Sequence, residues 1–419
     1  MKPRWCAAPW LVLLAAPMQT GAQVPPSDLG QKAKVDREML AFNPGYPKSV
    51  LSREVQALSL AAQVRTIEAS GRKTSCSHQI LNETLWMLGH TAEFSRIDAR
   101  LRDLKASIAS PEREGIADEQ DPEDGSWGRC YTEWSFKLDA SLDHLLLDPD
   151  KTPPLPMRLL DRVNSPEKLT AYLTSISVSD IPRTGIDYRR EFNETLSNLV
   201  RLILRDRPPG YPWHPQLKQT LLDLVLNRFR NPQTAWWGER YVRNGRVEFV
   251  DDLSATYHIV SYLKGDVPDL GVMVNTLLAV KDEPYPVGWL NGKGYSNHHN
   301  MDVVSLLRFG WPYLKAEQKQ MASAEIDKML RWCLRESLQA DGSFRPQIGD
   351  DSMEELTYFG VEFLARIGYF DRSRRFWTTD DLPGGEAARQ KIVAFIEKHL
   401  ATGGAGGEYY RSALKDLTP

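Results

Sequence analysis

The segment Gly288–Tyr313, with the sequence GWLNGKGYSNHHNMDVVSLLRFGWPY, combines a turn and a helix in one unit. Its first half is rich in glycine, which lets the backbone bend freely. Asn297 or Asn300 can cap the apolar helix that begins near Met301. Two histidines and three asparagines therefore lie where a loop meets a rigid helix, which is a common position for functional groups.

The same unit recurs along the chain, and this repeat is what predicts the fold. Six times, at intervals of 50 to 58 residues, a polar turn leads into an apolar helix. The predicted starts of these inner helices are Asn82, Asp139, Asn193, Asp251, Met301 and Asp351. Between them lie more charged segments with apolar residues at three- and four-residue spacing, as in solvent-facing helices. These predicted outer helices cover residues 95–108, 166–175, 214–229, 270–280, 316–338 and 386–400.

This alternation of inner and outer helices predicts an all-α fold, an (α/α)6 toroid in which each hairpin buries its apolar face against its neighbours. We expect a single toroid domain over residues 51–419, with an additional helix over residues 51–69. Residues 23–50 are expected to form an extended arm because they carry four prolines. Strand signals are scarce, so no substantial sheet is expected after residue 80.

The amino terminus has the pattern of a secretory signal peptide over residues 1–22. Lys2 and Arg4 precede an apolar run, and small residues lie before Gln23. No later stretch is long and apolar enough to cross a bilayer, so we expect an exported protein without a membrane anchor, either secreted or periplasmic. A net charge of −3 gives no basic excess, which argues against nucleic acid as a partner.

Three cysteines remain after this cleavage: Cys76, Cys130 and Cys333. An odd number leaves at least one free thiol, and the spacings match no zinc pattern. A Cys76–Cys130 disulfide, formed in an oxidising compartment, and three buried thiols are both compatible with the sequence.

Helical toroids of this size that carry a signal peptide resemble secreted carbohydrate-active enzymes, including polysaccharide lyases and several glycoside hydrolases. The DGSWG turn at residues 124–128 also resembles the glycine–aromatic turns of terpenoid-cyclase-like toroids. The resemblance covers nearly the whole mature chain, but it lies in the architecture and in no specific family motif. It implies an enzyme that acts on a polysaccharide or oligosaccharide without a cofactor or a metal ion.

In such a toroid, the inner-helix amino termini and the turns before them meet at one mouth. Four tryptophans in these turns suit stacking on sugar rings: Trp127, Trp236, Trp237 and Trp289. Arg240 and Arg345, from the same turns, could bind a substrate carboxylate through two parallel hydrogen bonds. Asp251 and Asp252 are expected to line the same cleft.

The first predicted mechanism is β-elimination on a glycan that contains uronic acid. It requires a group that neutralises the sugar carboxylate, a base for the adjacent proton and an acid for the leaving oxygen. The residues predicted to supply these groups are His299, His298, Tyr295, Asn297, Asn300, Tyr241 and Tyr257. His299 is the preferred base because it lies near the helix start and a histidine has an ordinary pKa of about 6.5. The structural alternative is that Asn300 only caps the helix and one histidine is buried.

The second predicted mechanism is hydrolysis by two carboxylates. The candidates are Asp251 with Asp252, or Asp350 with Asp351, and Glu354. Aspartate is equally favoured at a helix start by capping and by the helix dipole, so these residues also have a purely structural explanation.

A third reading is a glycan-binding toroid without catalytic activity. An enzyme is expected to place His298 or His299 beside a tyrosine and an arginine in one cleft. A binding module is expected to display its aromatic residues on an open face.

Overall fold

A computed structural model describes residues 46–69, 75–110, 119–147, 152–291, 294–345, 353–401 and 407–417. The predicted signal peptide and residues 23–45 of the predicted arm lie outside these ranges. The described part of the chain is mostly helical, as the repeat predicts. Its first helix, α2 (Tyr46–Ala69), begins inside the predicted arm, which corrects that boundary. Pro47 is accommodated because it lies in the first turn, where no intrahelical N–H is needed.

Helices are present at all six predicted inner positions, although two of them begin more than one turn earlier than predicted. Asn82 and Asp139 lie in the middle of their helices, because upstream residues such as Ile80 and Phe136 extend the buried face. The other described starts lie within about one turn of the predicted positions. The six helices are α3 (Ser75–His90), α5 (Trp134–Leu147), α8 (Arg189–Ile203), α10 (Leu253–Tyr262), α12 (Asn297–Gly310) and α14 (Met353–Arg366).

The outer helices follow the predicted ranges closely. They are α4 (Phe94–Ala109), α6 (Pro166–Ser175), α9 (Leu217–Asp223), α11 (Leu270–Ala279), α13 (Ala316–Trp332) and α15 (Gly385–Ala401). Two of them, α9 and α13, continue into π-helical turns over Leu224–Arg228 and Cys333–Ser337. Shorter elements are η2 (Arg158–Arg162), α7 (Ile181–Thr184), η4 (Trp311–Tyr313) and η6 (Arg372–Arg374), and the final helix is α16 (Gly407–Leu417).

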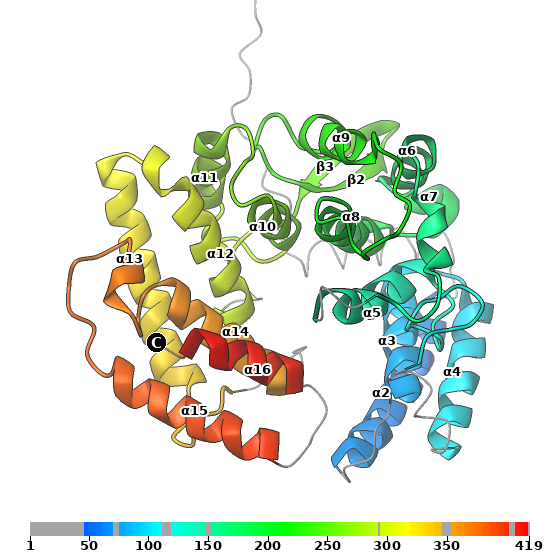
Figure 1. Cartoon of the computed structure of the whole chain (residues 1–419), viewed down its shortest axis with the longest axis horizontal. Helices are drawn as coiled ribbons and strands as arrows, with labels where there is room; N and C mark the ends of the chain where they lie inside the picture. Colours follow the sequence, from blue (N-terminus) through cyan, green and yellow to red (C-terminus); the bar gives the residue numbers. More distant parts are fainter. Residues whose placement is uncertain are drawn as a thin grey trace, which may run out of the picture.

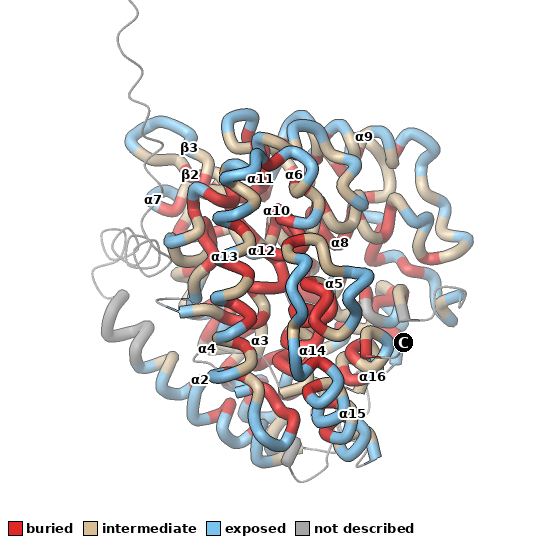
Figure 2. Tube along the Cα trace, turned by 90° about the vertical axis from the view of Figure 1, so that its left-hand side faces the viewer, coloured by how far each residue is buried: buried red, intermediate tan, exposed pale blue. Residues whose placement is uncertain are grey.

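The inner helices from α5 to α14 pack against one another in chain order, and α16 then packs on α14. Figure 1 shows them following an arc around the middle of the molecule, where α14 and α16 face α3 and α5. In Figure 2, buried positions concentrate on α10 and α12 in the interior, whereas α2 and α15 alternate between buried and exposed positions. This arrangement brings inner-helix residues from distant repeats to the centre of the molecule.

A small three-stranded sheet interrupts the helical pattern and was not predicted. Strands β2 (Gly238–Arg243) and β3 (Arg246–Asp251) form an antiparallel hairpin, and β1 (Val178–Ser179) pairs parallel to β2. The hairpin turns at Asn244 and Gly245, which both have positive φ, at 52° and 73°. Two central turn residues with positive φ match the right-handed twist of the flanking strands. The sheet is small, so the fold class remains helical.

The apolar core consists of two clusters. The smaller one unites α2, α3 and α4 with Tyr131 and Phe136, and the larger one extends from α5 to α16. A disulfide between Cys76 and Cys130, whose Cα atoms lie 5.4 Å apart, joins α3 to the segment before α5. Of the two alternatives for Cys76 and Cys130, a disulfide or buried thiols, the structure contains the disulfide. Cys333 is free, and burial raises the pKa of its thiol.

Candidate functional site

The first turn of α12 holds the histidine and asparagine cluster. The Ser296 hydroxyl caps this helix by accepting a hydrogen bond from the His299 backbone N–H at 3.1 Å. The cap predicted at Asn297 or Asn300 is therefore wrong, because a serine one residue upstream takes that position. Asn297 instead donates its side-chain amide to the Ser337 hydroxyl at 2.8 Å, and Asn300 is fully buried.

Several buried polar atoms of this turn lack a hydrogen-bond partner among the described residues. They are Oδ1 of Asn297, Nδ1 of His299 and both side-chain amide atoms of Asn300. Buried polar groups are nearly always hydrogen-bonded in folded proteins, so a cluster of exceptions marks a functional site or bound water.

His299 stacks on a tyrosine, and the ring of that tyrosine also lies near an arginine. The Tyr285 ring stacks on the His299 ring, with centroids 4.5 Å apart and an angle of 20° between the planes. The Arg189 guanidinium lies 5.4 Å from the Tyr285 ring centroid, on the side of α8. The aromatic partner of His299 is therefore Tyr285 and not the predicted Tyr295, and the arginine near that ring is Arg189 and not the predicted Arg240.

Asp252 connects the starts of α8 and α10. Its Oδ1 accepts the Ala255 N–H at 2.9 Å and so caps α10. Its Oδ2 accepts two hydrogen bonds from Arg189, at 3.1 and 2.9 Å, and one from the Asn193 amide at 3.1 Å. Asp251 accepts from Asn231 at 3.0 Å, and burial raises its pKa. With all of these bonds, Asp252 acts as a structural link.

Burial changes the acid–base properties of the histidines. It lowers the pKa of His299 to about 3, of His298 to about 4 and of His258 to about 3. His298 stacks flat on Phe359 with centroids 4.1 Å apart, and His258 Nδ1 lies 2.8 Å from the Tyr262 hydroxyl. All three side chains are neutral at neutral pH. The prediction that His299 is a base with an ordinary pKa is wrong, because burial destabilises its imidazolium form.

The three predicted tyrosines have partners away from His299. Tyr241 donates to the Asp187 carboxylate at 2.9 Å, next to the small sheet. The Tyr295 hydroxyl lies 3.5 Å from Glu325 of α13. Tyr257 is buried, its hydroxyl lies 3.9 Å from the Met301 sulfur, and burial raises its pKa. None of these three contacts places the tyrosine hydroxyl beside His299.

Three of the four tryptophans belong to the core. Trp236, Trp237 and Trp289 are fully buried, and each indole N–H donates to a backbone carbonyl of an outer helical segment at 2.8–3.0 Å. Their predicted role in stacking on sugars is wrong, because no ring face is left for a ligand. Trp127 is half-buried and stacks on His144 with centroids 4.7 Å apart.

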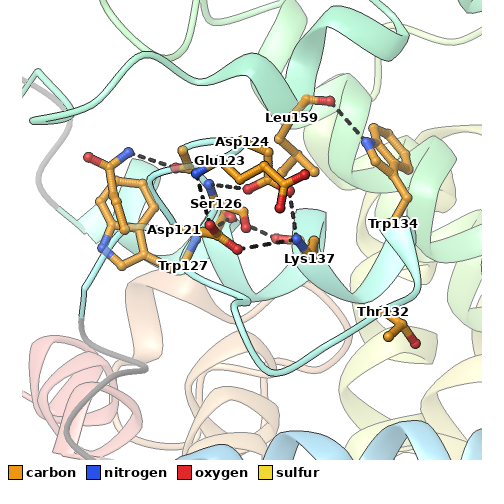
Figure 3. Close-up of polar contacts among 12 residues, drawn as sticks. Asp121, Glu123, Asp124, Ser126, Trp127, Thr132, Trp134, Lys137 and Leu159 are labelled. Carbon is orange, nitrogen blue, oxygen red and sulfur yellow. Dashed lines mark hydrogen bonds and ion pairs between the residues drawn. The ribbon is translucent and has the colours of Figure 1, made fainter.

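The DGSWG turn that carries Trp127 has its own internal hydrogen bonds (Figure 3). Asp124 accepts the Ser126 N–H at 2.9 Å and pairs with Lys137 at 2.6 Å. The Trp127 N–H donates to the Ser141 hydroxyl at 3.0 Å. The glycine–aromatic pattern thus builds a turn that docks onto α5, which explains it without a ligand.

The two predicted substrate arginines have different surroundings. Arg240 donates to the Arg228 backbone carbonyl and lies 4.5 Å from the Phe249 ring centroid, on the small sheet. Arg345 is exposed and follows the bend after α13. Asp350 and Asp351 lie outside the described residues, so the carboxylate pair proposed there has no described geometry.

Parts of the turns of neighbouring repeats nevertheless contact one another. The Asp252 N–H donates to the Trp237 carbonyl at 2.9 Å, and the Leu253 N–H donates to the Pro286 carbonyl at 2.7 Å. Pro286 is adjacent to Tyr285, which stacks on His299. Trp237 and His299 are therefore linked through a short series of contacts and do not lie at opposite ends.

A polar face along α8 was missed by the sequence reasoning. Arg190, Glu194, Asn198 and Arg201 recur at spacings of four, four and three residues, which places them on one side of the helix. The opposite side is apolar and buried. The spacing is present in the sequence, but the repeat singles out residues at helix starts and not residues along one inner helix.

No helix in the described part of the chain is long and apolar enough to span a membrane. Within the same residues, no three His, Cys, Asp or Glu side chains are placed to hold a metal ion together. Comparisons with protein-family models, curated proteins and solved structures gave no match to this chain. Its function has to be argued from the geometry around α8, α10 and α12.

Proposed function

We propose that this chain is an exported α/α-toroid enzyme that cleaves a polysaccharide containing uronic acid by β-elimination. The observation that carries the proposal is the contact series from His299 through Tyr285 to Arg189. The toroid is supported by the packing of α5, α8, α10, α12 and α14 in chain order. Export is supported by the signal-peptide pattern and by the Cys76–Cys130 disulfide, which is typical of oxidising compartments.

Tyr285 is the proposed proton-transfer residue. It is half-buried, so its hydroxyl can meet a substrate while its ring is held by His299. Arg189 lies beside the ring, and the charges of Arg190 and Tyr285 also interact. Positive charge nearby stabilises a phenolate, which is the form that accepts a proton. The neutral His299 behind the ring fixes its position.

Arg190 is the proposed group for the substrate carboxylate. Its side chain is exposed and pairs with Glu194 through one nitrogen, Nε, at 2.6 Å. Neutralising the carboxylate makes the adjacent C–H proton more acidic. Tyr285 takes that proton, the electron pair forms a carbon–carbon double bond, and the bond to the glycosidic oxygen breaks. The leaving oxygen receives a proton, which Tyr285 can return.

The experiment is a substrate panel with two readouts. The mature protein is incubated with acidic and neutral polysaccharides, and unsaturated uronides and reducing ends are followed together. New unsaturated ends that depend on Tyr285 support the proposal. Reducing ends that form without unsaturated ends would show that cleavage is hydrolysis and not elimination. Binding without either product would show a glycan-binding toroid without catalytic activity.

A second candidate, a two-carboxylate glycoside hydrolase, is favoured by one observation on α5 and α8. Burial, and to a lesser degree the charge of Asp139, raises the pKa of Glu194. Asp139 is exposed and accepts a hydrogen bond from Asn198 at 3.0 Å. A carboxyl group that keeps its proton can act as the general acid, and a second carboxyl group nearby can act as its catalytic partner. Under this reading Glu194→Gln abolishes the release of reducing ends, whereas Tyr285→Phe does not.

A further inference from the structure

Arg201 lies in the last turn of α8, and no carboxylate in the described part of the chain forms an ion pair with it. Among the described residues it forms no hydrogen bond or ion pair, and its Nε is buried without a partner. Its guanidinium lies 5.1 Å from the centroid of the Tyr262 ring on α10. Stacking on an aromatic face holds a guanidinium in place and leaves its N–H edge available. Arg201 is therefore a pre-positioned cation whose charge is not compensated by a carboxylate.

The groups around Arg201 do not supply that compensation. His258, whose Nδ1 lies 2.8 Å from the Tyr262 hydroxyl, is neutral at neutral pH because burial lowers its pKa. Arg366 of α14 pairs with Glu362 at 2.7 Å and so uses its own carboxylate. Burial raises the pKa of Asp302 well above its usual range, which favours its uncharged form.

Asp139 of α5 is an exposed carboxylate that faces this region. It is held by Asn198, one turn before Arg201 on α8, at 3.0 Å. Burial raises the pKa of Tyr262 most, the Asp139 charge raises it further, and Arg201 and Arg205 lower it. Asp139 therefore lies on the border of the region without pairing with Arg201.

We propose that Arg201, stacked on Tyr262, forms a second subsite that binds the carboxylate of another uronic acid residue in the same glycan chain. This inference rests on the proposed function, because it assumes an acidic glycan at the centre of the molecule. Eleven residues separate Arg190 from Arg201, which corresponds to about 16 Å along the helix. One sugar residue cannot contact both arginines, so the polar face of α8 binds a chain of several residues.

The test measures binding separately from cleavage. Calorimetry in a Tyr285→Phe background uses disaccharides and hexasaccharides of galacturonate, mannuronate and glucuronate, with a neutral hexasaccharide as reference. Arg201→Gln is expected to weaken binding of the preferred acidic hexasaccharide by roughly 10- to 100-fold, the usual effect of losing a charged hydrogen bond. Binding of the disaccharide is expected to change little, and Arg201→Lys is expected to retain part of the affinity.

The matched control is Arg331→Gln, which removes the same charge from the outer helix α13, where Arg331 pairs with Asp327. It is expected to bind like the parent, and circular dichroism verifies that each variant is folded. Equal hexasaccharide affinity in Arg201→Gln and in the parent would overturn the subsite while leaving elimination by Tyr285 untouched. Binding that depends on Arg201 without unsaturated products from the wild type would instead overturn the proposed function alone. If none of the acidic hexasaccharides binds, both proposals fail.

Discussion

Both hydrogen bonds from the Arg189 guanidinium end on one oxygen of Asp252, Oδ2, at 3.1 and 2.9 Å. Asp252 is 2% exposed, so Asp252→Ala removes a largely buried ion pair with Arg189. We expect the free energy of unfolding to fall by about 3–5 kcal/mol in urea denaturation. The exposed pair partner Asp327 offers a control, since Asp327→Ala is expected to cost less than about 1 kcal/mol. Equal stability of Asp252→Ala and the parent would contradict the role of this link.

Tyr285→Phe removes the hydroxyl and retains the ring that stacks on His299. We expect kcat/KM for the formation of unsaturated ends to fall by roughly 10²–10⁴-fold, the usual contribution of a positioned acid–base group. The melting temperature is expected to change little because the ring contact remains. Tyr313→Phe, at an exposed site on η4, serves as the matched control and is expected to retain full turnover. A fully active Tyr285→Phe enzyme rules out the proposed proton transfer.

His299 makes stability depend on acid pH. Burial lowers its pKa to about 3 in the folded chain, compared with about 6.5 when unfolded. Below about pH 6.5 the unfolded chain binds a proton that the folded chain does not, so this residue favours unfolding increasingly as the pH falls. Between about pH 8 and about pH 5 the loss amounts to about 2 kcal/mol. Denaturation at both pH values should show His299→Gln gaining that amount relative to the parent, and a constant difference would contradict the assignment.

Glu362 changes stability with pH in the opposite direction from His299, and it does so at higher pH. Burial, and then the neighbouring Asp416 on α16, raise its pKa to about 7, while Arg366 opposes the shift. The folded chain keeps this proton where the unfolded chain has lost it, so stability falls as the pH rises from about 4.5 and the loss is complete above about pH 7. Asp416→Asn removes one cause of the raised pKa. We expect a shallower loss in this variant when unfolding is measured on both sides of neutrality, and an unchanged slope would refute the coupling.

The Cys76–Cys130 disulfide closes a loop across 54 residues of sequence. The loop-entropy relation gives about 4 kcal/mol of stabilisation for a loop of this length. Because the bond lies in the smaller core cluster, reduction is expected to speed amide hydrogen exchange in α3 and α4. Exchange in α12, within the larger cluster, should change much less. Uniform acceleration across both clusters would show that they unfold as one unit.

The outer helices could be predicted from the sequence because their boundaries are local. Ser165 caps α6 by accepting the Lys168 N–H, and Pro166 occupies the first position, so both ends of the predicted range hold. Asn244 followed by Gly245 is an equally local signal for the β2–β3 hairpin. The prediction rested on helical periodicity and did not include it.

The site was only partly predictable because burial is not a local property. An aromatic residue in a turn can face a cleft or the core, and Trp236 and Trp289 face the core. His299 was identified from its place at a helix start, whereas its partner Tyr285 lies in a preceding loop with no motif of its own. The packing of α8 against α10 brings Arg189 to this pair, and no spacing in the sequence encodes that contact.

The two sides of α8 place different constraints on the sequence. Phe192, Leu196, Leu199 and Ile203 on one side are buried in the apolar core, whereas the other side carries the charged residues Arg190, Glu194 and Arg201. Under the proposed function, exchanges on the polar side would alter which glycan is preferred. A library randomised at these polar positions alone would be the natural starting point for redirecting specificity, and related chains would be free to diverge there first.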